Sequence, residues 1–148
     1  MTRVELAQAC LDKYGAESQK LKMVGEGAEL TAAVCRMAEG RFVEDQVAEE
    51  VADCLAILDQ MDILFTVNKD NYGVAPLYTG HNNLLIILGD IQLGLAGMAN
   101  GCEPNKPFFL LFYMLRCELM GLSKEIGQGK VDTWRQIKAD RMEGRLKI

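Results

Sequence analysis

Apolar residues recur every three or four positions along most of the chain, which is the spacing that places them on one face of an α-helix. The sequence contains no pair of strand-like segments joined by a hairpin turn, and the apolar run at 108–113 has helical flanks. The pattern therefore predicts an all-α fold, a helical bundle of about five to six helices built on antiparallel hairpins. The expected helices span about 3–14, 16–39, 43–68, 82–100, 107–127 and 133–146, with a loop at 69–80.

The expected helix ends are marked by residues that favour those positions. Thr2 followed by Glu5 has the spacing of a capping box. Gly40 follows the second helix, and the link at 40–42 is too short for a crossover, so the second and third helices should form an antiparallel hairpin. Later helix starts are expected at Asn105, with Pro107 in the first turn, and at Asp132.

Two pairs of acidic residues lie on the two helices of this hairpin. Glu26 and Glu29 are three residues apart, as are Glu50 and Asp53, and residues with this spacing share one helix face. Folding the two helices back on each other would bring all four carboxylates together. Carboxylate oxygens are the ligands that hard divalent cations prefer, so we expect these four residues to hold Mg²⁺, with Mn²⁺ as a possible substitute.

The second acidic pair occupies the apolar side of its helix. Glu50 and Asp53 align with Ile57, where a carboxylate is costly unless it is paired or coordinated. Glu49 projects away from this stripe, and Asp59 is expected on the opposite, more polar side of the helix. Glu50 is therefore the preferred ligand over Glu49, although a solvated acidic face is the simpler explanation for any one such pair.

The ordered set of motifs resembles the all-α NTP pyrophosphatases, the MazG-like superfamily of phages and bacteria. The resemblance rests on E-x-x-E, a spacer of 20 residues, E-x-x-D, and a final Lys/Arg segment, IKADRMEGRL. It covers about residues 17–68 and 131–147. One difference is that Gly25 stands where many members have an additional Glu.

The resemblance implies hydrolysis of a nucleoside triphosphate between its α- and β-phosphates, which yields a monophosphate and pyrophosphate. Glu26 or Glu29 is the expected general base toward the attacking water. Lys22 lies one turn before Glu26 on the same stripe and is expected to contact a phosphate. Phosphate contacts are also expected from three residues in the basic segment: Lys138, Arg141 and Arg145. For Arg145, an equal alternative is that its charge complements the helix dipole.

Composition limits the alternatives. The 148 residues are 49% hydrophobic and 25% charged, as expected for a single globular domain over residues 1–148. The net charge of −5 and the lack of a basic run argue against binding to nucleic acid or to an anionic membrane. The five cysteines show no C-x-x-C spacing and there is one histidine, His81, which disfavours a zinc site. With no signal peptide or membrane-spanning run, we expect a cytoplasmic protein of a bacterium, or of a host cell if phage-encoded.

The segment 82–122 is poor in charge, so it should form either the centre of the fold or a subunit interface. We expect a homo-oligomer, a dimer or a tetramer, which sedimentation as a monomer alone would contradict. Candidate base readers are Asn82, Asn83 and Gln92, whereas Trp134 is expected to cover the core rather than to stack on a base.

Two other functions remain open from the sequence. The chain could be a helical assembly or regulatory module that has lost turnover, as the Gly25 difference allows. It could also hydrolyse a phosphoribosyl nucleotide, although the long apolar segment is unlike the short chains of that type. Neither the preferred base nor the number of metal ions follows from the sequence.

Overall fold

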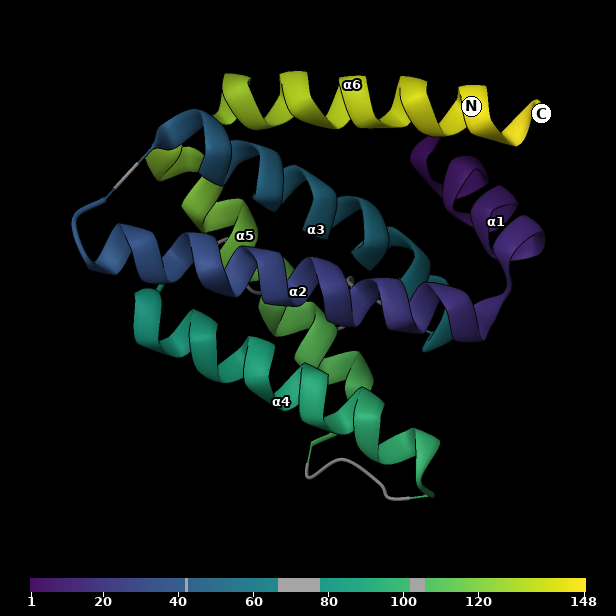
Figure 1. Cartoon of the computed structure of the whole chain (residues 1–148), viewed down its shortest axis with the longest axis horizontal. Helices are drawn as coiled ribbons and strands as arrows, with labels where there is room; N and C mark the ends of the chain where they lie inside the picture. Colours follow the sequence, from purple (N-terminus) through teal and green to yellow (C-terminus); the bar gives the residue numbers. More distant parts are fainter. Residues whose placement is uncertain (42, 67–77, 102–105) are drawn as a thin grey trace.

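The computed structural model describes residues 1–41, 43–66, 78–101 and 106–148. Within these ranges the chain forms six helices and no strand, which confirms the all-α prediction (Figure 1). The helices are α1 (Arg3–Tyr14), α2 (Ala16–Ala38), α3 (Glu44–Leu64), α4 (His81–Ala99), α5 (Phe108–Ile126) and α6 (Gln128–Leu146).

Helix α3 is the centre of the bundle. It packs against α1, α2, α5 and α6, while α4 covers α2 and α5 on the other side (Figure 1). Val51, Leu55 and Leu58 are buried on α3, and they join a core that includes Phe112 and Leu115 of α5. A helix with apolar residues on most of its faces can be covered by several neighbours at once, which explains its central position.

The turn between α2 and α3 forms the expected hairpin. Gly40 adopts a φ of 78°, a left-handed conformation that glycine accepts without strain. The Arg41 amide then donates a 2.8 Å hydrogen bond to the carbonyl of Arg36, which satisfies one of the free carbonyls at the end of α2. This tight reversal fixes the register in which the two acidic pairs face each other.

The start of α6 differs from the prediction. The helix begins at Gln128 rather than after Asp132, and Asp132 lies inside it, accepting a 2.9 Å hydrogen bond from Gln128 Nε2. Gly127, with a φ of 118°, ends α5 and starts α6 in one residue. Val131 is fully buried, and helical structure from Gln128 onward allows it to reach the core. Burial of this side chain therefore outweighs the capping preference of Asp132.

The end of α3 also differs. The helix stops at Leu64, earlier than expected, and Thr66 has a φ of 51°. The Phe65 ring turns onto α5, with its centroid 4.7 Å from that of Phe108 and 5.3 Å from that of Phe112. This aromatic packing anchors the end of α3 against α5.

Other predicted boundaries can be compared only in part. Pro107 is the residue before α5 rather than part of its first turn. Asn105 lies outside the described residues, as does most of the predicted loop, of which residues 78–80 are described and are not helical.

A buried ionic network joins α3, α5 and α6. Arg116 on α5 donates hydrogen bonds of 2.9 Å to Asp59 and 2.6 Å to Asp62, and Arg135 on α6 donates one of 2.9 Å to Asp59. The Asp59 side chain is 15% exposed. Asp59 was expected on the more polar side of the helix, and two guanidinium groups from distant parts of the chain cover it there.

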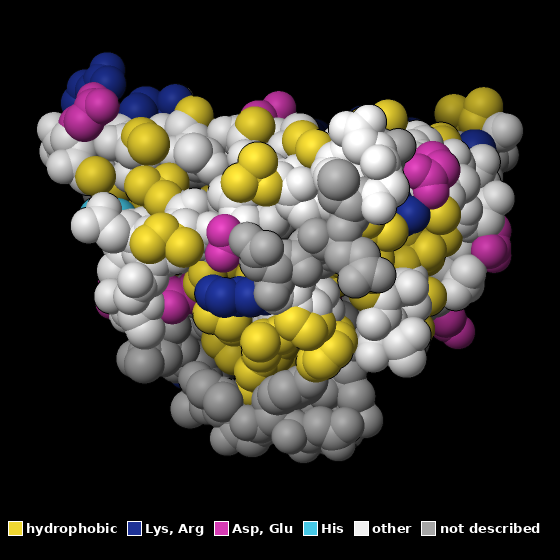
Figure 2. Space-filling model, turned by 90° about the horizontal axis from the view of Figure 1, so that it is seen from below, with side chains coloured by type: hydrophobic (Ala, Val, Ile, Leu, Met, Phe, Trp, Pro, Cys, Tyr) yellow, Lys and Arg dark blue, Asp and Glu magenta, His cyan; other side chains and the backbone are white. Residues whose placement is uncertain are grey.

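Apolar side chains remain exposed on the α4 side of the bundle. Ile86 and Leu93 on α4 are 58% and 75% exposed, and Phe109 on α5 is 39% exposed. Figure 2, seen from the side on which α4 lies in Figure 1, shows hydrophobic side chains gathered on this face. Helices α4 and α5 thus contribute to the core on one side and expose apolar side chains on the other. None of the described helices is long and apolar enough to cross a membrane.

Removing Asp59 should destabilise the fold strongly. In Asp59→Ala the guanidinium groups of Arg116 and Arg135 lose a shared buried carboxylate, and we expect a loss of about 3–5 kcal/mol in the free energy of unfolding. Urea unfolding would measure this. The control is Asp140→Ala on the exposed side of α6, which should change stability by less than about 0.5 kcal/mol. Equal stability of the two variants would contradict the importance of the network.

Candidate metal and phosphate site

The structure brings the four predicted acids together. Glu26 and Glu29 lie one turn apart on α2, and Glu50 and Asp53 lie one turn apart on the facing side of α3. One carboxylate oxygen from each residue lies within 4.8 Å of the other three. Such a group of oxygens could hold a metal ion, and it is the only group of three or more acids, histidines or cysteines with this property among the described residues. We call these four residues the acid cluster.

Burial makes the acid cluster electrostatically costly. One oxygen of Glu26 and one of Glu50 are buried and lack a hydrogen-bond partner among the described residues. Burial, with the nearby charges of Asp53 and Glu29, raises the pKa of Glu26 to about 7. Burial and the adjacent Glu29 likewise raise the pKa of Glu50 to about 7. Carboxylates crowded in this way are stabilised by a cation or by protons, and a divalent ion would supply the missing partner.

Burial also raises the pKa of Asp53 and of the neighbouring Cys54. At Asp53, Lys138 opposes this rise in the pKa. Cys54 on α3 is fully buried beside the cluster, and both burial and the negative charges raise the pKa of its thiol. Cys54 is therefore a neutral thiol, which provides an apolar side to the cluster rather than a ligand.

The predicted basic residues line a pocket beside the acids. Its walls come from α2, α3 and α6, and its charged residues are Glu26, Asp53, Lys22, Lys138, Arg141 and Arg145. All four cations predicted to bind phosphate are thus on one side of the acid cluster. Such a pocket can hold an anion that also contacts a metal ion on the cluster, which is the arrangement that a polyphosphate requires.

Lys138 connects α6 to the acid-bearing helix. Its ammonium group lies 3.0 Å from a Glu49 oxygen and 3.1 Å from Asp53. Burial lowers the pKa of Lys138, but the bonds to Glu49 and Asp53 outweigh it and raise the pKa overall. The sequence predicted Glu50 rather than Glu49 as a ligand, and Glu49 lies outside the acid cluster. Its carboxylate accepts a hydrogen bond from Lys138 and so helps to orient this lysine.

A further pocket continues from the first along α2 and α3. It shares Lys22, Gln60, Met142 and Arg145 with the pocket beside the acids and adds Cys10, Tyr14 and Gln19. The sequence analysis missed Gln19 and Gln60. Their positions provide a signal, because each lies seven residues from an acid on the same helix and therefore on nearly the same face.

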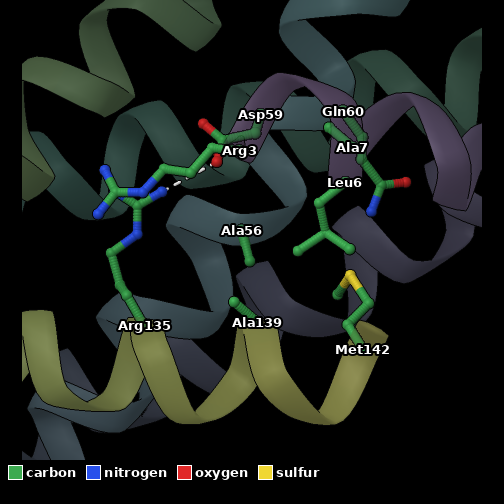
Figure 3. A pocket seen from close by; sticks show the side chains of 9 residues that line it. All are labelled: Arg3, Leu6, Ala7, Ala56, Asp59, Gln60, Arg135, Ala139 and Met142. Atoms are coloured by element: carbon green, nitrogen blue, oxygen red, sulfur yellow. Dashed lines mark hydrogen bonds and ion pairs between the residues drawn. The ribbon is translucent and has the colours of Figure 1, made fainter. Parts of the chain in front are cut away.

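A smaller pocket lies between α1, α3 and α6 on the other side of Gln60 (Figure 3). Leu6, Ala56, Ala139 and Met142 make much of its lining apolar, and the Arg135–Asp59 ion pair lies at its edge. Burial lowers the pKa of Arg135 to about 10, against the opposing effect of Asp59. Because Asp59 and Arg135 pair with each other, this edge of the pocket belongs to the structural contact between α6 and α3.

The base readers considered from the sequence lie away from these pockets. Asn82 and Asn83 are exposed at the start of α4, and Asn83 donates a 3.0 Å hydrogen bond to Thr79. Gln92 lies against Gly27 of α2. Trp134 packs against the core and donates a 3.2 Å hydrogen bond to Asp45. None of these four residues lines the pockets beside the acid cluster.

The acid cluster should make stability depend on pH when divalent ions are removed. Folded Glu26 and Glu50 keep protons up to about pH 7, whereas the ordinary value is 4.5, so the folded state binds more protons between these values. The free energy of unfolding should therefore fall as the pH rises from 5 to 8. Thermal melting in EDTA would show this as a lower melting temperature at pH 8.

Glu50→Gln should melt above the wild type at pH 8 in EDTA, since it removes one of the repelling charges. Glu44→Gln, on the same helix, is the matched control: it loses only an exposed ion pair with Lys130 and should keep the wild type's fall in melting temperature from pH 5 to pH 8. Added Mg²⁺ should raise the melting temperature of the wild type and not that of Glu50→Gln. A melting temperature that rises from pH 5 to 8 would contradict the electrostatic account.

Comparison with known proteins gives no family or function for this chain. No family model, curated protein or solved structure matches the chain.

Proposed function

We propose that this protein is a Mg²⁺-dependent nucleoside triphosphate pyrophosphohydrolase of the MazG-like type, which converts (d)NTP to (d)NMP and pyrophosphate. One observation carries the proposal: four carboxylates within 4.8 Å of one another adjoin a pocket lined by four cationic side chains. Carboxylates alone would suit a metal store, and cations alone would suit any anion. Together they suit a metal–polyphosphate complex.

The acid cluster would hold the metal. Glu26, Glu29, Glu50 and Asp53 supply only oxygen ligands, as Mg²⁺ prefers, and Mn²⁺ is a chemically suitable substitute. When bound, the metal would neutralise phosphate charge and lower the pKa of a coordinated water. The unpartnered buried oxygens of Glu26 and Glu50 support this fit.

The remaining steps use the chain's own residues. Lys22, Arg141 and Arg145 would bind and orient the phosphate oxygens, and Lys138 would hold Asp53 in place while facing the same pocket. Glu26 or Glu29 would take the proton of the attacking water at a carboxylate oxygen. Cleavage between the α- and β-phosphates follows from the family resemblance, with the nucleoside monophosphate as one product. Control or sanitation of the nucleotide pool, in the cytoplasm, is the corresponding role.

Product analysis would test the proposal. Purified protein is incubated with a panel of ribo- and deoxynucleoside triphosphates in Mg²⁺ or EDTA, and pyrophosphate and orthophosphate are measured separately. We expect pyrophosphate and monophosphate in Mg²⁺ only. Glu50→Gln should lower kcat/KM by about 100-fold or more, since loss of groups that merely support a metal ligand already costs 10–100-fold. Glu44→Gln should match the wild type.

Each other outcome has a distinct meaning. Release of orthophosphate would contradict α–β cleavage. Absence of turnover by a folded, metal-binding protein would favour the module that has lost activity. Turnover of a phosphoribosyl nucleotide in preference to every triphosphate would favour the third function.

A further inference from the structure

Two buried glutamines line the pocket that continues beyond the acids. Gln19 on α2 is 4% exposed and Gln60 on α3 is 1% exposed. The Oε1 atom of each is buried without a hydrogen-bond partner among the described residues. Unbonded buried amide oxygens are costly, and they are rare in folded proteins unless a ligand or water completes them. Both residues line the same pocket, so a ligand that donates hydrogen bonds there could complete the two oxygens.

The two glutamines lie at the same end of the acid-bearing hairpin. Gln19 is seven residues before Glu26, and Gln60 is seven residues after Asp53. Because α2 and α3 run antiparallel, both displacements lead in the same direction, by about 10 Å at 1.5 Å per residue. Lys22, Arg145 and Gln60 line both pockets, and Lys22 lies between Gln19 and Glu26 along α2.

The lining of this second pocket changes from charged to amphipathic. Cys10, Tyr14 and Met142 join the two carboxamides there. Figure 3 shows Gln60 reaching from α3 toward the side of α6 that carries Met142. Apolar walls with a few polar groups suit a flat heterocycle, which needs stacking surface and hydrogen bonds along one edge.

We propose that Gln19 and Gln60 form the base-recognition subsite, where they determine which nucleoside triphosphate is hydrolysed; this rests on the proposed function. A nucleotide bound with its phosphates at the acid cluster would place its sugar past Lys22 and Arg145 and its base at the glutamines. In each carboxamide the unpartnered atom is the oxygen, which is an acceptor. The pair would accept hydrogen bonds from the N–H groups of a base edge and reject a base whose acceptors face the two oxygens.

Methionine variants test the subsite. Gln19→Met and Gln60→Met keep the length of the side chain and remove its hydrogen bonds, and Gln46→Met on the exposed side of α3 is the matched control. The kcat/KM is measured for each nucleoside triphosphate and for 2-deoxyribose 5-triphosphate, which has no base. In the wild type and the control, we expect one base to be preferred. In both subsite variants, the ratio of kcat/KM for that nucleotide to kcat/KM for the abasic compound should fall about tenfold or more.

A structural role for the glutamines predicts a different result. If both variants keep the wild-type base preference, or lose activity equally on every compound including the abasic one, the proposal is wrong. A lower melting temperature in both variants with the base preference retained would likewise assign the glutamines to the fold.

Failure of the proposed reaction can be separated from failure of the subsite. If the wild type hydrolyses no triphosphate, the binding of the nucleoside monophosphates is measured by calorimetry. Binding that depends on the base and loses this dependence in Gln19→Met and Gln60→Met would support the subsite without the reaction. Binding that is absent or independent of the base would overturn the subsite.

Discussion

The candidate site depends on apolar packing that confines four carboxylates between α2 and α3. Like charges within 4.8 Å repel one another, and the burial of Glu26 and Glu50 removes much of the water that would screen them. The fold tolerates this because α3 is held by helices on several sides, so that separation of α2 from α3 would expose a large apolar core. Apolar packing thus supports an arrangement that electrostatics alone would disfavour, which is typical of functional sites.

Helix α6 gives the acid cluster its cationic neighbour. Val131 is buried at its start, Arg135 pairs with Asp59 in its middle, and Lys138 contacts Glu49 and Asp53. These contacts fix the rotation of α6 about its own axis and direct Arg141 and Arg145 into the pocket. The buried ionic network therefore has a second consequence besides stability, because it helps to determine where the cations beside the acid cluster lie.

The sequence was sufficient for features set by local spacing. The pairing of Glu26 with Glu29 and of Glu50 with Asp53 follows from the helical period, and their meeting follows from the short link after Gly40. The network at Asp59 could not be predicted, because Arg116 and Arg135 are distant in sequence and lie on other helices. The predicted start of α6 was wrong because the capping preference of Asp132 competes with burial of Val131, and only the packed structure reveals that burial. Gln19 and Gln60 were overlooked because their seven-residue distance from an acid becomes informative only when the structure shows both on one pocket.

The most direct test of the central claim, that the acid cluster is a divalent cation site, is a titration of free Mn²⁺ followed by electron paramagnetic resonance. The account predicts saturable binding to the wild type, competition by Mg²⁺, and a loss of affinity of about 100-fold in Glu50→Gln but not in Glu44→Gln. Absence of Mn²⁺ binding by the wild type, or equal affinity in wild type and Glu50→Gln, would contradict it.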